Sequence, residues 1–112
     1  MTTLGPNEGI ELLYTRECTT WREALANLQQ ALKNLNIDAE PKIITIDTMG
    51  QAYEYNFFAS PTINLYGVDI DPQARRVSRR GIGCNRPYFW DKQSYPVPPV
   101  KMIEDGLKEL YK

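Results

Sequence analysis

The sequence predicts an α/β domain in which a mixed four-stranded sheet carries helices on both faces, and three observations lead to this fold class. Residues 10–14 form a short, nearly continuous apolar run, which is typical of a central strand covered on both sides. A long amphipathic helix follows that run. Pro41 and Pro87 mark two further strand candidates as edge strands, because proline cannot donate a hydrogen bond to a strand ladder.

The first helix has the clearest pattern in the chain. Thr20-Trp21-Arg22-Glu23 matches a capping box, in which the threonine and glutamate side chains bond the free backbone amides of the first turn. Apolar residues then recur at helical spacing, at Trp21, Ala24, Leu25, Leu28, Ala31, Leu32 and Leu35. We therefore expect an amphipathic helix of about four turns.

The middle of the chain continues the alternation of strands and helices. Residues 42–47 are rich in β-branched side chains and predict the edge strand that follows Pro41. Thr48 and Gln51 offer a second, weaker capping box for a short helix. Residues 62–66 then form a third strand that ends at the turn-forming Gly67.

The last third contains an irregular, basic segment before the final strand and helix. Residues 69–81 show no periodicity and are interpreted as an arginine-rich insertion. The aromatic residues 84–90 predict the last strand, at a sheet edge because of Pro87. Pro99 is suited to a helix start, and a final helix follows with one apolar face. The predicted order is β-α-β-α-β-β-α.

Bulk composition limits the classes of function. The 112 residues predict one domain over 10–112 behind a flexible lead-in at 1–9. A net charge of −1 and the lack of a long apolar run argue against nucleic-acid and membrane partners. Two cysteines without a secretory signal predict a cytoplasmic protein and argue against a permanent disulfide. The absence of histidine excludes Cys-His and Ser-His catalysis.

Cys18 lies between the first strand and the first helix, where a thiol ionises most easily. The helix N-terminus favours the thiolate, which is the nucleophilic form. Arg16 and Arg22 add nearby positive charge, whereas Glu17 and Glu23 oppose it. A reactive Cys18 is the favoured interpretation, and an unreactive loop cysteine is the alternative.

Two motifs resemble those of the thioredoxin-like superfamily, which includes the glutaredoxin-like proteins. Cys18-Thr19-Thr20-Trp21 stands where that family has Cys-x-x-Cys, and Ser60-Pro61-Thr62 stands where it has a cis-proline facing the redox cysteine. The element order resembles the family over residues 10–112. Trp21 replaces the second cysteine of the motif, so a disulfide within the motif is impossible.

The resemblance implies a monothiol-type thiol–disulfide oxidoreductase with Cys18 as its nucleophile. The substrate would be a disulfide-bearing protein or small thiol, which Cys18 attacks to form a mixed disulfide. Glutathione, a partner thiol or Cys84 would then resolve that intermediate, and no bound cofactor is expected. Substrate contacts are expected from Arg16, Thr19, Thr20, Trp21, Ser60, Pro61 and Thr62. An extended substrate could add as a strand beside the backbone of Ser60.

The predicted last strand places Cys84 two strands away from Cys18. Neighbouring strands lie about 4.8 Å apart, so this separation exceeds the Cα limit of about 7 Å for a disulfide. A packed strand cysteine is the favoured interpretation. In the alternative, the arginine-rich insertion folds back and delivers Cys84 as a resolving thiol. No metal site is predicted, because two thiolates without histidine supply too few ligands for a metal ion.

The arginine cluster also has two interpretations. It is either a solvated loop or an anion site in which Arg75 and Arg79 bind a carboxylate or oxyanion. The second interpretation gives an alternative function, an oxyanion reductase that resembles the arsenate reductases. A further alternative is a non-catalytic binding module with a thioredoxin-like fold, since fold alone does not determine function.

Overall fold

Within residues 5–111, which the computed structural model describes, four strands form one mixed sheet in the order β2-β1-β3-β4. Central strand β1 pairs in parallel with β2 and antiparallel with β3, and β4 pairs antiparallel with β3. The bounds are Ile10–Tyr14 for β1, Lys42–Thr45 for β2, Thr62–Leu65 for β3 and Val68–Asp69 for β4. The predicted mixed sheet is confirmed, and so is the edge position of β2 after Pro41.

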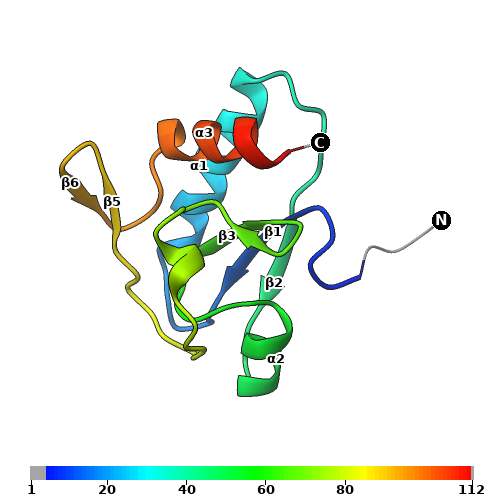
Figure 1. The fold of residues 1–112 in the computed structure, drawn as a ribbon, viewed down its shortest axis with the longest axis vertical. Coiled ribbons are helices and arrows are strands. Elements are labelled where there is room, and N and C mark those ends of the chain that lie inside the picture. Colours follow the sequence, from blue (N-terminus) through cyan, green and yellow to red (C-terminus); the bar gives the residue numbers. More distant parts are fainter. Residues whose placement is uncertain (1–4, 112) are drawn as a thin grey trace.

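Three α-helices of the described chain cover the sheet on both faces. They are α1 (Trp21–Asn34), α2 (Met49–Glu54) and α3 (Val100–Leu110), and α1 and α3 lie on the same side in Figure 1. Side chains of β1 alternate between the two layers, because successive residues of a strand point to opposite faces. Leu12 packs in the core beneath α1 and α3, whereas Leu13 packs with Ala52 of α2.

The fourth strand differs from the prediction. Tyr66 and Gly67 both adopt positive φ angles, which makes a tight two-residue turn and sends the chain back at Val68 to form β4. The arginine-rich segment therefore follows the fourth strand and contains a 3₁₀ turn at Ala74–Arg76. The predicted last strand at residues 84–90 is wrong. Only Tyr88–Trp90 forms a strand there (β5), and it pairs with Gln93–Tyr95 (β6) in a separate two-stranded hairpin beside the main sheet (Figure 1).

For two of the three α-helices of the described chain, the helix begins as the sequence predicts. Thr48 forms the predicted capping box with Gln51, and Pro99 is the residue before α3. The capping box predicted at α1 is wrong, because the Thr20 side chain makes no capping hydrogen bond. Gly106 in the middle of α3 has a packing reason: a Cβ there would lie 2.9 Å from the Ile70 side chain.

The lead-in is only partly described. Residues 1–4 of the predicted flexible segment 1–9 lie outside the described residues. The remainder is tied to the sheet rather than loose. The backbone N–H of Asn7 donates to the carboxylate of Glu11 at 3.0 Å, and the Lys42 ammonium donates to the Gly5 carbonyl at 2.6 Å. Buried Glu11 also pairs with Lys42 at 3.0 Å, so this corner is an ordered part of the domain.

Candidate functional site

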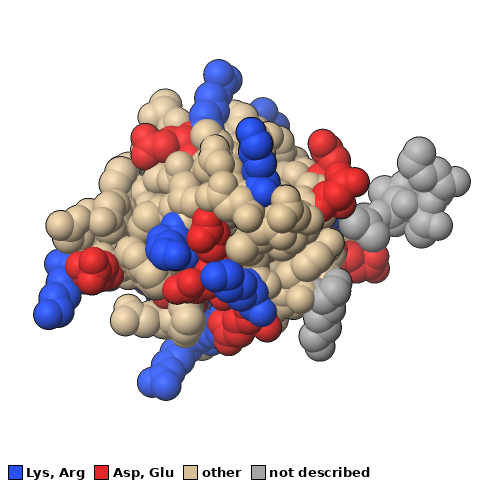
Figure 2. Space-filling view, turned by 90° about the horizontal axis from the view of Figure 1, so that it is seen from above, with Lys and Arg blue, Asp and Glu red and all other residues tan. Residues whose placement is uncertain are grey.

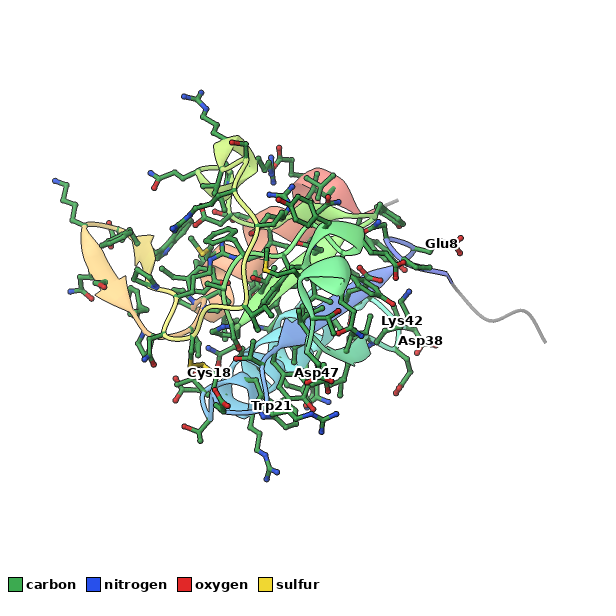
Figure 3. The ribbon with its side chains drawn as sticks, turned by 90° about the horizontal axis from the view of Figure 1, so that it is seen from below. Glu8, Cys18, Trp21, Asp38, Lys42 and Asp47 are labelled. Carbon is green, nitrogen blue, oxygen red and sulfur yellow. A yellow bond between two sulfur atoms is a disulfide. The ribbon has the colours of Figure 1, made fainter. Side chains whose placement is uncertain are left out.

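Cys18 is placed by the turn between β1 and α1. Its backbone N–H donates to the Thr15 carbonyl at 3.1 Å, which closes the turn immediately after the strand. Thr20, two residues later, is the N-cap residue of α1. The cysteine side chain is only 1% exposed, at the end of the domain where Figure 3 labels Cys18 and Trp21. The predicted location of Cys18 at the start of the first helix is therefore confirmed.

Cys18 and Cys84 form a disulfide in this structure. Their Cα atoms lie 5.6 Å apart, although 66 residues separate them in the chain. The prediction of a packed strand cysteine two strands away is wrong, because Cys84 lies in an exposed, irregular segment and not in a strand of the sheet. The alternative, in which the chain after the arginines folds back to Cys18, describes the structure.

The segment that carries Cys84 lies against the chain just before Pro61. Gly83 and Ala59 form an isolated parallel bridge. The Ser60 N–H donates to the Gly83 carbonyl at 2.8 Å, and the Arg86 N–H donates to the Ser60 carbonyl at 3.0 Å. Glycine suits position 83 because a Cβ there would lie 3.1 Å from the Phe58 carbonyl oxygen. The backbone of Ser60, predicted to be free for an added substrate strand, is thus already paired within the chain.

The Ser60–Pro61–Thr62 motif sits directly beside the disulfide. The Ser60–Pro61 peptide bond is cis, as the motif predicts. The Ser60 carbonyl lies 3.8 Å from the Cys18 sulfur. Thr62 is buried, and its hydroxyl donates to the Ala59 carbonyl at 2.7 Å. The Ser60 carbonyl therefore borders the sulfur, whereas the Thr62 side chain bonds within the turn.

Polar groups from two other segments approach the Cys18 sulfur. The backbone N–H of Asn85 donates to it at 3.4 Å, and the Thr20 hydroxyl lies 3.8 Å from it. An N–H donor and a hydroxyl can both stabilise negative charge on sulfur. Asn85 was not singled out in the sequence, and its position depends on the unpredicted path of the Cys84 segment.

A shallow depression of about 370 Å³ opens beside Cys18. The predicted site residues Arg16, Thr19 and Trp21 border it with Cys18, and so does Arg22. Trp21 is half-buried, stacks on Tyr14 with 4.4 Å between ring centroids, and packs against the core. The Arg22 guanidinium lies over the Trp21 ring at 5.2 Å. Arg16 pairs with Asp47 at 3.0 Å, on the same end of the molecule in Figure 3.

The arginine cluster is dispersed and does not gather at the disulfide. Arg75 forms a bidentate pair with Glu109 of α3, and it also donates to the Asp69 carbonyl. The Arg79 guanidinium lies over the Phe58 ring at 5.4 Å. In the face shown in Figure 2, basic and acidic side chains are interspersed, without a large patch of one sign. No described contact joins Arg75 or Arg79 to Cys18.

Arg86, two residues after Cys84, forms a buried ion pair. Arg86 is 3% exposed and contacts both carboxylate oxygens of Asp69, at 2.8 and 3.1 Å. It also donates to the Thr62 hydroxyl at 2.8 Å. Burial raises the pKa of Asp69, and the adjacent guanidinium opposes that rise. The sequence signal was present in Asp69, Asp71 and Arg86, but their pairing depends on the folded path.

No protein-family model, curated protein or solved structure matches this chain at a significant level. Family assignment and function therefore rest on the geometry of the chain itself. Among residues 5–111, no helix is long and apolar enough to cross a membrane. The described part of the chain also contains no group of three or more histidine, cysteine, aspartate or glutamate residues placed to hold a metal ion.

Proposed function

We propose that this protein is a thioredoxin-like thiol–disulfide oxidoreductase whose working pair is Cys18 and Cys84. One observation carries the proposal: a disulfide joins a buried cysteine at the start of α1 to an exposed cysteine on the facing segment. The sheet order supports the thioredoxin-like assignment, and so does the cis Ser60–Pro61 bond, because the Ser60 carbonyl lies 3.8 Å from the Cys18 sulfur. Cys84 then takes the resolving role that Trp21 cannot fill.

The two ends of the disulfide differ in access and in leaving ability. Cys84 is exposed, whereas Cys18 is 1% exposed, so an incoming thiolate reaches the Cys84 sulfur more easily. Attack there breaks the bond and releases Cys18 as the leaving thiolate. That thiolate is stabilised by the Asn85 N–H and by the N-terminus of α1. A better stabilised thiolate leaves faster, so both asymmetries favour the same direction of attack.

The proposed cycle balances as two exchanges. A reducing thiolate attacks the Cys84 sulfur, forms a mixed disulfide there and displaces the Cys18 thiolate. A second reducing thiolate attacks that mixed disulfide, displaces the Cys84 thiolate and leaves joined to the first as the oxidised reductant. The Cys18 thiolate then attacks a substrate disulfide and displaces one substrate thiolate, which takes up a proton. Finally, the Cys84 thiolate attacks the Cys18 sulfur, expels the second substrate thiolate and restores the Cys18–Cys84 bond.

The depression beside Cys18 supports an anionic thiol as the co-substrate. Arg16 and Arg22 border it, and guanidinium groups match the geometry of carboxylates. Glutathione carries two carboxylates and a thiol, so it is the reductant we propose. A disulfide-bearing protein or a small mixed disulfide is the proposed substrate.

The test compares two single cysteine variants in the reduction of a glutathionylated substrate. We expect Cys18→Ser to abolish the reaction. We expect Cys84→Ser to accept one glutathione on Cys18, visible by mass spectrometry, and to lose most multiple turnover at low glutathione. Full turnover by Cys84→Ser would overturn Cys84 as the resolving thiol and return the mechanism to an external thiol. Full activity of Cys18→Ser would overturn the proposed function.

A non-catalytic binding module is the second candidate, and the burial of Cys18 favours it. In that case the disulfide fixes the segment 81–86 against residues 57–60, where their backbones are already paired. Reduction by glutathione separates the two candidates. A structural disulfide stays oxidised in millimolar glutathione, whereas a working pair equilibrates with it. The oxyanion reductase gains no support, because Arg75 and Arg79 contact Glu109 and Phe58 instead of the disulfide.

A further inference from the structure

The segment around Cys84 is attached differently on the two sides of the cysteine. On the preceding side, the contacts are backbone hydrogen bonds. The Gly81 N–H donates to the Phe57 carbonyl at 3.4 Å, the Gly83 N–H donates to the Phe58 carbonyl at 3.2 Å, and the Gly83 carbonyl accepts from the Ser60 N–H at 2.8 Å. Ile82 between them is exposed. Backbone hydrogen bonds of a short irregular segment can open locally. Apart from the disulfide, this side is held by these backbone bonds.

The following side is anchored by a buried charge. The Arg86 guanidinium binds Asp69 through two hydrogen bonds and lies 3.7 Å from the carboxylate of Asp71. It is sandwiched against two rings, 4.7 Å from the centroid of Phe58 and 4.4 Å from that of Tyr88. Removing one partner of a buried pair leaves an uncompensated charge, which is strongly unfavourable. This anchor does not depend on the disulfide.

Tyr88 fixes the same side a second time. Its side chain is fully buried in the core beneath α1 and α3, and its hydroxyl donates to the Pro61 carbonyl. The backbone N–H of Arg86 adds a third link, to the Ser60 carbonyl. Cys84 lies two residues before Arg86, and two residues of extended chain span at most about 7 Å. The anchored residues therefore limit how far Cys84 can move when its bond to Cys18 is broken.

We propose that Arg86 is a positioning residue that keeps Cys84 within reach of Cys18 in the reduced protein. This inference rests on the proposed function, because it concerns how that function completes its cycle. When Cys18 carries a substrate as a mixed disulfide, the anchored Cys84 thiolate attacks the Cys18 sulfur. The Cys18–Cys84 bond forms, the bond from Cys18 to the substrate breaks, and the substrate thiolate leaves. A tethered thiol acts at a high effective concentration, so an external thiol is outcompeted.

The test measures ring closure in buffers of reduced and oxidised glutathione. Alkylation and mass spectrometry give the fractions of dithiol, glutathione mixed disulfide and closed disulfide for the wild type, Arg86→Met and Arg86→Lys. Arg76→Met is the control, because Arg76 is an exposed arginine of the same basic segment. We expect Arg86→Met to lower the ring-closure constant by about tenfold or more and to accumulate the mixed disulfide. Arg86→Lys should fall between it and the wild type, and Arg76→Met should match the wild type.

A purely structural role for Arg86 gives a different result. It would destabilise the oxidised and reduced forms equally and leave the ring-closure constant unchanged, which would overturn the proposal. A failure of the proposed function would look different. The ring-closure constants would still differ between the variants, but the protein would not reduce any substrate disulfide. Conversely, unchanged constants with normal turnover reject only the positioning role.

Amide hydrogen exchange of the wild-type protein covers the case in which Arg86→Met does not fold. After reduction, we expect the Gly83 amide to lose its protection and the Arg86 amide to keep most of its own. If both amides become equally fast on reduction, the segment is not anchored at Arg86 and the proposal is overturned. If neither amide exchanges faster after reduction, the disulfide does not restrain the segment. That result also contradicts the expected opening on the Gly83 side alone.

Discussion

The N-termini of α1 and α2 carry nearly the same sequence signal but differ in structure. Each starts at a threonine with a glutamate or glutamine three residues later. At α2, Thr48 is extended, its hydroxyl accepts from the Gln51 N–H at 3.1 Å, and Gln51 accepts from the Thr48 N–H at 3.1 Å. At α1, Thr20 has helical backbone angles and makes no capping bond with its side chain.

The difference lies in what the two threonine side chains contact. An N-cap side chain reaches the first turn only when its residue is extended, and the helical angles of Thr20 direct its hydroxyl elsewhere. That hydroxyl lies 3.8 Å from the Cys18 sulfur. The start of α2 is fixed by local hydrogen bonds, whereas the turn before α1 is held by a disulfide to a distant segment. Local sequence rules fail most often at functional sites.

Among the changes that test this comparison, breaking the disulfide should have the largest effect on the free energy of unfolding. The cross-link joins residues 66 positions apart, and the chain-entropy model assigns such a loop about 4 kcal/mol of stability. We therefore expect Cys84→Ser to lower the free energy of unfolding by this order, measured by urea denaturation against the oxidised wild type. The reduced wild type should resemble Cys84→Ser. A loss below about 1 kcal/mol would mean that the disulfide does not hold the start of α1.

Thr48→Ala should have the next largest effect on stability. It removes the hydroxyl that caps α2, and loss of such a cap costs about 1 kcal/mol. Thr20→Ala is the matched variant at α1 and should cost less than about 0.5 kcal/mol, because no capping bond is lost there. Urea denaturation of both oxidised variants tests the contrast. Equal losses would show that the two helix ends are stabilised alike.

Most of the sheet and the two longer helices could be predicted from the sequence, because each of these elements has a characteristic local sequence pattern. The apolar run of β1 and the helical spacing from Trp21 onward reflect burial on known faces. The edge position of β2 follows from Pro41, which cannot donate to a ladder. Cys18 could be located because it lies in the short turn between two such elements.

The partner of Cys18 could not be predicted, because nothing local determines the path of residues 77–87. That path depends on backbone bonds to residues 57–60 and on the pair between Arg86 and Asp69, which are distant in sequence. Nothing local marks Arg86 as buried, because its burial accompanies its pairing with the distant Asp69. The tight turn at Tyr66 and Gly67 was equally decisive, because it places β4 before the arginines and leaves the later chain free to return to Cys18.

Thr20→Ala should have a moderate effect on the chemistry of Cys18 despite its small effect on stability. In the reduced protein, the hydroxyl can donate to the Cys18 thiolate, and its removal withdraws one stabilising contact. We expect the rate of alkylation by iodoacetamide at pH 6 to fall about threefold, since a net hydrogen bond contributes roughly 0.5–1.5 kcal/mol. Thr48→Ala is the control and should react like the wild type. An unchanged rate in Thr20→Ala would show that its hydroxyl does not act on the sulfur.

Glu23→Gln should have the smallest effect on stability and on the reactivity of Cys18. It tests whether a carboxylate in the first turn of a helix influences the thiol at α1 but not at α2. Glu23 lies in the first turn of α1, where a carboxylate stabilises the helix by about 0.3–1 kcal/mol but opposes a thiolate at Cys18. The variant should therefore lose a few tenths of a kcal/mol of stability and gain about twofold in Cys18 alkylation rate at low salt. High salt should remove the gain, because exposed charges are screened. Gln51→Glu at α2 should leave that rate unchanged. A slower reaction in Glu23→Gln would mean that the carboxylate assists the thiol. The proposed chemical role of the α1 N-terminus would then lose its electrostatic basis.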